Sequence, residues 1–199
     1  MMMSASRFAS LLRCGTLALC LLPVLAPAEA DSLQEAPASV EGSVALALTT
    51  ASEAHQRSDR EELAQALGII DRAGARPLQE WDGQDPVPQW RADLADAEAV
   101  ADTPVYRGSP LGPGYRAGKV SGGASDHFEQ VFLSGQKASI ALSSSSASPL
   151  SLRVIDRDHR PVCENDSSAC QWIPLFTQRY SIMIYNRGNK AAEYFLVVD

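Results

Sequence analysis

The sequence contains no cluster of basic residues, and this absence excludes one class of function. Lys and Arg together number 17 against 24 Asp and Glu, which gives a formal net charge of −7. Nucleic-acid binding depends on clustered Lys and Arg side chains that neutralise phosphates. We therefore expect no nucleic-acid partner.

Long apolar runs are also missing. The longest, over residues 14–25, is well short of the ~20 residues that a membrane-spanning helix requires. Pro23 lies inside this run and Pro27 follows it closely. An uncleaved membrane anchor is therefore the less favoured of two interpretations of the N-terminus.

The favoured interpretation is an export signal. Arg7 and Arg13 precede the apolar run, and Ala28-Glu29-Ala30 follows it with the small residues that a signal peptidase accepts. We expect residues 1–30 to be a cleaved signal peptide, with the mature chain beginning at Asp31. The protein is then periplasmic or secreted and has no transmembrane span.

Cysteine is scarce, with four residues in the chain. Cys14 and Cys20 leave with the signal peptide, so Cys163 and Cys170 remain as a pair in an oxidising compartment. A metal site is the alternative, but six intervening residues are not a usual zinc spacing and no paired histidines accompany them. The sequence predicts a disulfide.

Residues that could form an active site are also few. No G-x-S-x-G motif is present, and the nearest substitute is the serine run 143–146 combined with His127 and Asp126. Serine runs between strands are ordinary turn material. His55 and His159 have no second ligand at metal spacing. We expect no enzymatic activity and no resident cofactor.

Residues 31–103 show the three- and four-residue spacing of amphipathic helices. Ser58 and Glu61 fit a capping box at the start of a second helix, and Gly74 fits its left-handed stop. A third helix is expected after residues 85–88. The apolar stripes of the three helices comprise Val40, Val44, Ala47, Leu48 and Ala51, then Leu63, Leu67 and Ile70, and then Trp90, Leu94, Ala97 and Ala101.

Residues 104–118 are rich in Pro and Gly and are expected to form a linker. Two Tyr-Arg pairs lie within it, Tyr106 with Arg107 and Tyr115 with Arg116. Because Arg stacks on aromatic faces, these pairs could form a ligand platform. The favoured alternative is that both tyrosines pack against the C-terminal domain.

Over residues 119–199 the apolar period changes to two, with turn residues between short segments. This pattern is typical of an antiparallel β-sandwich. The fold class is therefore α+β, with two to three helices followed by a C-terminal sandwich. The alternating sets comprise Phe128, Gln130 and Phe132, then Ala138, Ile140 and Leu142, then Leu150, Leu152 and Val154, then Tyr180, Ile182 and Ile184, and finally Tyr194, Leu196 and Val198.

Acidic residues gather near the cysteine pair. Hard cations such as calcium bind several oxygen ligands, but Arg160 stands where an EF-hand loop needs an oxygen and no glycine follows. We expect a solvated acidic loop closed by the disulfide, and a calcium site is the alternative. The residues concerned are Asp156, Asp158, Glu164 and Asp166, with Asn165 among them.

The C-terminal region resembles the bacterial pre-peptidase C-terminal domain, a small β-sandwich found in secreted proteases and other exported proteins. The resemblance lies in residues 128–132 with the turn 134–136, and in residues 150–156, 180–186 and 192–198. It implies an accessory or binding module and says nothing of the helical segment.

Together these features predict an exported, non-catalytic accessory or interaction protein of the bacterial cell envelope. Its expected partner is an envelope protein or a glycan. One alternative is a small module that binds a ligand, a glycan or calcium, and a second is a hydrolase with an unrecognised site.

Overall fold

A computed structural model describes residues 39–95, 112–144, 149–165 and 168–199, without the side chains of Glu164 and Asn165. All of these residues belong to one compact unit, Ala36–Asp199. The expected signal peptide lies outside the described residues. No helix among the described residues is long and apolar enough to cross a membrane.

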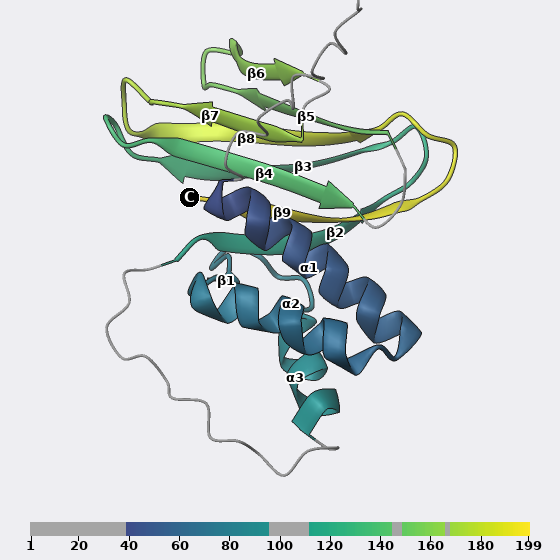
Figure 1. Cartoon of the computed structure of the whole chain (residues 1–199). Coiled ribbons are helices and arrows are strands. Elements are labelled where there is room, and N and C mark those ends of the chain that lie inside the picture. The colour runs from purple at the N-terminus through teal and green to yellow at the C-terminus, as the bar shows by residue number, and fades with distance from the viewer. Residues whose placement is uncertain (1–38, 96–111, 145–148, 166–167) are drawn as a thin grey trace, which may run out of the picture. The chain divides into compact units, whose positions relative to one another are not determined.

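Three helices precede most of the strands, as the sequence predicts (Figure 1). The described residues of the predicted apolar stripes are buried, except that Leu94 is partly buried and that Val40, the first residue of its helix, is 58% exposed. Ala97 and Ala101 lie outside the described residues. The helices are α1 (Val40–Arg57), α2 (Arg60–Arg72) and α3 (Val87–Ala95).

The start of α2 differs by one residue from the prediction. Ser58 has a φ of 58° and ends α1, so it is not available as the cap of the next helix. Asp59 is the N-cap instead, and its carboxylate accepts from the backbone N–H of Glu62 at 3.1 Å. Gly74, with a φ of 64°, follows the end of α2 as predicted.

Two sheets form the predicted sandwich. Sheet A has the order β1-β2-β9-β4-β7, and sheet B has the order β3-β8-β5-β6. Every pair is antiparallel except β1 with β2, which is parallel. The strands are β1 (Arg76–Pro77), β2 (Gly114–Val120), β3 (Ser125–Phe132), β4 (Ala138–Ser144), β5 (Leu150–Ile155), β6 (Pro161–Asn165), β7 (Ala169–Trp172), β8 (Gln178–Asn186) and β9 (Ala192–Val198).

Two of these strands correct the predicted boundaries. β1 lies inside the segment expected to be helical, and β2 occupies residues 114–118 of the expected linker. Gly114 and Gly118 pair with β9 as part of this strand, and they are glycines at positions where neighbouring side chains leave no space for a Cβ. A Cβ on Gly118 would lie 2.4 Å from the Tyr194 ring, and one on Gly114 would lie 2.3 Å from Leu78.

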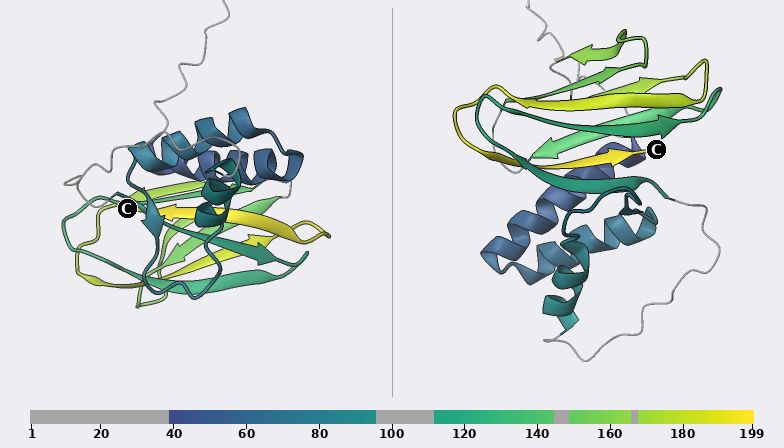
Figure 2. Two further views of the ribbon diagram at one scale, coloured as in Figure 1. Left: turned by 90° about the horizontal axis from the view of Figure 1, so that it is seen from below. Right: turned by 180° about the vertical axis from the view of Figure 1, so that it is seen from behind.

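All three helices lie on the outer face of sheet A (Figure 2). α1 contacts β4 and β9 directly. The β4 side chains that face α1 are small. One of them is Ser143, whose Oγ accepts a hydrogen bond from the Thr49 hydroxyl of α1 at 2.8 Å. One apolar core fills the space between the helices and sheet A, and a second fills the space between the two sheets.

The predicted disulfide is present and joins the two sheets. Cys163 lies on β6 and Cys170 on β7, with their Cα atoms 6.1 Å apart. β6 is an edge strand of sheet B, and β7 is an edge strand of sheet A. The bridge therefore closes one side of the sandwich covalently.

Candidate functional site

Two neighbouring loops at one end of the sandwich are tied together by hydrogen bonds. They are residues 133–137, which follow β3, and residues 173–177, which precede β8. The Ser134 N–H donates to Thr177 Oγ1 at 3.0 Å, and the Ser134 hydroxyl donates to the Leu175 carbonyl at 2.8 Å. The Gly135 N–H donates to the Pro174 carbonyl at 2.8 Å. The two loops thus hold each other in one arrangement.

These loops expose large apolar side chains. Leu175 is 81% exposed, Phe176 71%, Ile173 63% and Leu133 50%. Pro174, which has no backbone N–H, lies between Ile173, the first residue after β7, and the pair Leu175 and Phe176. We call these four side chains, Leu133, Ile173, Leu175 and Phe176, the apolar end.

A packed aromatic cluster supports the apolar end. Phe132, Trp172 and Tyr180 meet in edge-to-face contacts, with ring centroids 4.8, 5.7 and 5.4 Å apart. Phe132 directly precedes Leu133, and Trp172 directly precedes Ile173. Both loops of the apolar end therefore begin directly after a residue of this packed cluster.

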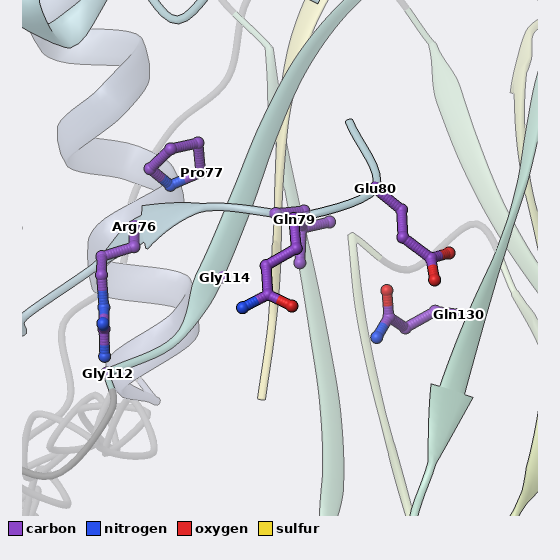
Figure 3. Close-up of a pocket in the computed structure, with 8 residues that line it drawn as sticks. Arg76, Pro77, Gln79, Glu80, Gly112, Gly114 and Gln130 are labelled. Atoms are coloured by element: carbon purple, nitrogen blue, oxygen red, sulfur yellow. The ribbon is translucent and has the colours of Figure 1, made fainter. Parts of the chain in front are cut away.

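A second feature, which we call the side cleft, lies between the segment 76–81 and strand β3 (Figure 3). It consists of two adjoining cavities of about 310 and 210 Å³, which share Leu78, Glu80 and Gln130 in their walls. In Figure 3 the Glu80 carboxyl and the Gln130 amide point toward one another.

Arg116 lies in the wall of the side cleft. Its guanidinium stacks over the Phe128 ring at 4.1 Å and lies 3.5 Å from the Asp126 carboxylate. Asp126 also accepts a hydrogen bond from the Tyr194 hydroxyl. Burial, together with this bond, raises the pKa of Tyr194 well above its usual value. The hydroxyl therefore remains protonated and donating.

The structure separates the two residues of the predicted Tyr115-Arg116 pair. Tyr115 is buried between sheet A and the helices, and its hydroxyl donates to Asp85 at 2.9 Å. Arg116, the next residue along β2, faces the other side of the strand toward β3. Tyr106 and Arg107 lie outside the described residues.

The expected acidic loop is a tight turn in which Asp156 bonds to the backbone. Its carboxylate accepts from the N–H groups of Asp158 and Arg160 at 2.9 and 2.8 Å. The Glu164 side chain and Asp166 lie outside the part of the chain that the structure describes. Among the side chains that are described, no group of three or more His, Cys, Asp and Glu could hold a metal ion.

The described part of the serine run lies on a different sheet from His127 and Asp126. Ser143 is on β4 of sheet A and contacts α1, whereas His127 and Asp126 are on β3 of sheet B. Ser145 and Ser146 lie outside the described residues. The described part of this set therefore does not have the geometry of a nucleophile with its base.

Comparison with solved structures finds similar folds. One is a periplasmic inhibitor of g-type lysozyme from Aeromonas hydrophila, with 17% identity, a TM-score of 0.38, and coverage of 44% of this chain and 84% of that chain. Another is the pre-peptidase C-terminal domain of a Bacillus anthracis collagenase, with 13% identity, a TM-score of 0.38, and coverage of 44% and 89%. A third is a mitogen from Yersinia pseudotuberculosis, with 13% identity, a TM-score of 0.39, and coverage of 43% and 83%.

The pre-peptidase C-terminal domain, to which the sequence bears a resemblance, is thus among the folds similar to this chain. No family model matches the sequence, and no curated protein matches it.

Sequence reasoning missed both the apolar end and the side cleft. The sequence does carry a local signal for the apolar end. Three large apolar residues surround a proline in Ile173-Pro174-Leu175-Phe176, and proline does not occur within a central strand, so these residues are not expected to be part of one. The side cleft has no comparable signal. Its walls are about fifty residues apart in the sequence and meet only in the folded chain.

Proposed function

We propose that this chain is an exported, non-catalytic binding protein that holds a protein partner of the bacterial envelope through its apolar end. The observation that carries this proposal is the exposure of Ile173, Leu175 and Phe176 on one loop, at 63%, 81% and 71%. Apolar side chains gathered on an otherwise polar surface mark interaction sites.

The energetics suit a docking surface. Burial of one Leu or Phe side chain stabilises a complex by about 1.5–3 kcal/mol. The loops are already tied by the bonds of Ser134 and Gly135. Little conformational entropy is therefore lost on binding.

The charge around the apolar end favours a protein over a lipid surface. Lys137 is the single charged residue of loops 133–137 and 173–177. Arg179, just beyond the second loop, is paired with Glu129 at 3.3 Å. Anionic membranes attract clusters of basic residues next to apolar ones. The chain instead carries a net charge of −7.

Two observations support export. The disulfide between Cys163 and Cys170 is of a kind that persists outside the reducing cytoplasm. Residues 1–30 have the charged, apolar and small-residue parts of a signal peptide. The non-catalytic part of the proposal is supported by the separation of Ser143 from His127 and Asp126 on different sheets.

Affinity capture from envelope extract of the native host tests this proposal. Leu175→Ser and Phe176→Ser should each lose the captured partner. Leu46→Ser is the matched control, because Leu46 is 62% exposed on α1 and lies outside the apolar end. Equal capture by all three variants, or loss of capture only in the Leu46 control, would contradict the proposal.

A further inference from the structure

The walls of the side cleft are rich in planar hydrogen-bonding groups. Gln79 and Glu80 come from one wall, and Gln130 comes from β3 on the other. An amide both donates and accepts, a carboxylate accepts, and a guanidinium such as that of Arg116 donates. The side cleft can therefore satisfy a ligand that carries many donors and acceptors close together.

The charges in the side cleft balance. Its walls contain two arginines, Arg76 and Arg116, and two glutamates, Glu80 and Glu129. Two of these charges are already paired. The Arg116 guanidinium lies 3.5 Å from the Asp126 carboxylate, and the Glu129 carboxylate lies 3.3 Å from the Arg179 guanidinium. A surface without an excess of either charge gives no electrostatic advantage to an anion or a cation. The charge distribution favours a neutral ligand.

Apolar groups complete the walls. Leu78, Trp81 and Phe128 lie beside the polar groups. The half-buried Trp81 indole lies close to Gly83, where a Cβ would be 2.1 Å from the indole Nε1. Small-ligand sites combine such apolar surface with a few placed polar groups. An amphipathic ring that presents both C–H groups and hydroxyls matches this mixture.

An extended peptide is the competing occupant, since β3 is the outermost strand of sheet B on this side. Strand addition needs the backbone groups along that edge. The His127 N–H already donates to Asp126 Oδ1 at 2.8 Å, and the Val131 carbonyl accepts from Gln130 Nε2 at 3.4 Å. These bonds occupy part of the edge, whereas the Gln130 amide keeps its second N–H and its oxygen for a ligand, so the observations favour recognition by side chains.

From these observations we infer that the side cleft is a binding site for a neutral saccharide. Gln79, Glu80 and Gln130 provide the hydrogen bonds to its hydroxyls, and Trp81 and Leu78 provide the apolar surface. This site is separate from the apolar end and does not depend on the proposed protein partner.

The test is an array of neutral saccharides, acidic saccharides and extended peptides, probed with the complete mature chain. The expected result is binding to neutral saccharides. Titration calorimetry with the best neutral ligand should then show roughly tenfold weaker binding for Gln130→Ala and for Glu80→Gln, as expected when a ligand hydrogen bond is lost.

Gln65→Ala is the matched control, because Gln65 is exposed on α2 outside the side cleft, and its affinity should equal that of the wild type. Three results would overturn the inference. They are no binding to any neutral saccharide, binding to peptides or acidic saccharides alone, and neutral-saccharide binding that neither Gln130→Ala nor Glu80→Gln weakens. None of these results bears on the Leu175 and Phe176 variants, so the two proposals fail separately.

Discussion

At the scale of single residues, two buried tyrosines anchor the strands β2 and β9. The Tyr115 hydroxyl donates to Asp85 and the Tyr194 hydroxyl donates to Asp126. Burial and the neighbouring carboxylate raise the pKa of each phenol well above its usual value near 10. Ionisation of either group is therefore unfavourable in the folded chain.

This gives the protein a defined sensitivity to alkali. In the unfolded chain a tyrosine titrates near pH 10, whereas in the folded chain each of these pKa values is higher. The contribution of these two tyrosines to stability is therefore fully present below about pH 10, and it falls above that pH by about 1.4 kcal/mol per pH unit for each tyrosine. Urea unfolding from about pH 9 to pH 11 should show this decline. Tyr194→Phe should make it shallower, and equal slopes in the two proteins would be inconsistent with the burial of this hydroxyl.

Residue-scale prediction from sequence succeeded where local geometry decides the outcome. Gly74 follows α2 in the left-handed conformation expected of it. The preceding cap was displaced by one residue, because Ser58 is used to end α1 and Asp59 has a better acceptor for the first turn of α2. The capping-box pattern in the sequence does not show that only Ser58 and Asp59 separate α1 from α2.

At the scale of elements, the disulfide connects the edge strands β6 and β7, one from each sheet. Each cysteine also pairs within its own sheet, Cys163 opposite Val154 and Cys170 opposite Ile140. The bridge therefore limits the separation of the two sheets at this side of the sandwich.

Removal of the bridge should destabilise the domain without changing its fold. The double variant Cys163→Ser and Cys170→Ser should lower the free energy of unfolding by about 2–3 kcal/mol, as expected for closure of so short a loop. Urea unfolding of the variant and of the wild type, each with and without reductant, measures the difference. Reductant should weaken the wild type alone, and an unchanged wild type would mean that the bridge contributes little.

Period-two patterns located the long strands but not the short ones. β4, β5, β8 and β9 bury the alternating sets that the sequence predicts, except that Leu150 at the start of β5 is partly buried. In β9 the intervening Phe195 and Val197 are buried as well, because the helices cover the outer face of sheet A. β2 was missed because its glycines suggest a linker, and their close contacts with Leu78 and Tyr194 exist only in the folded chain.

At the scale of the described unit, the helices and the sandwich share one of the two cores. Trp90 of α3 meets Phe195 of β9 edge-on, with centroids 6.1 Å apart, and α1 covers Ala141 and Val197. A sandwich without its helices would expose these side chains and Tyr115. The helices and the sandwich should therefore unfold together.

Phe195→Ala tests this coupling. Loss of the buried ring should reduce the free energy of unfolding by about 3–5 kcal/mol. Helical ellipticity and the fluorescence of the tryptophans should change at the same denaturant concentration, in the variant as in the wild type. Leu46→Ala, at a site 62% exposed, should change stability by less than about 0.5 kcal/mol. Separate transitions of helices and sandwich would show two independent domains.

The fold class could be predicted from the sequence because apolar periodicity reports which face of each element is buried. The binding surfaces could not, for two different reasons. The side cleft arises from contacts between β3 and the segment 76–81, which are distant in sequence. At the apolar end, the exposure of Leu175 and Phe176 depends on how two loops that are distant in sequence bond to each other through Ser134 and Gly135.

The central claim is that the apolar end contacts a protein partner, and site-specific photocrosslinking tests it most directly. A photoreactive phenylalanine analogue replaces Phe176 in one protein and Leu46 in another, so that both probes lie at exposed apolar positions of the same fold. Irradiation in the native host should give one discrete crosslinked protein species from position 176 and none from position 46. Crosslinks to lipid alone, or the same species from both positions, would contradict the claim.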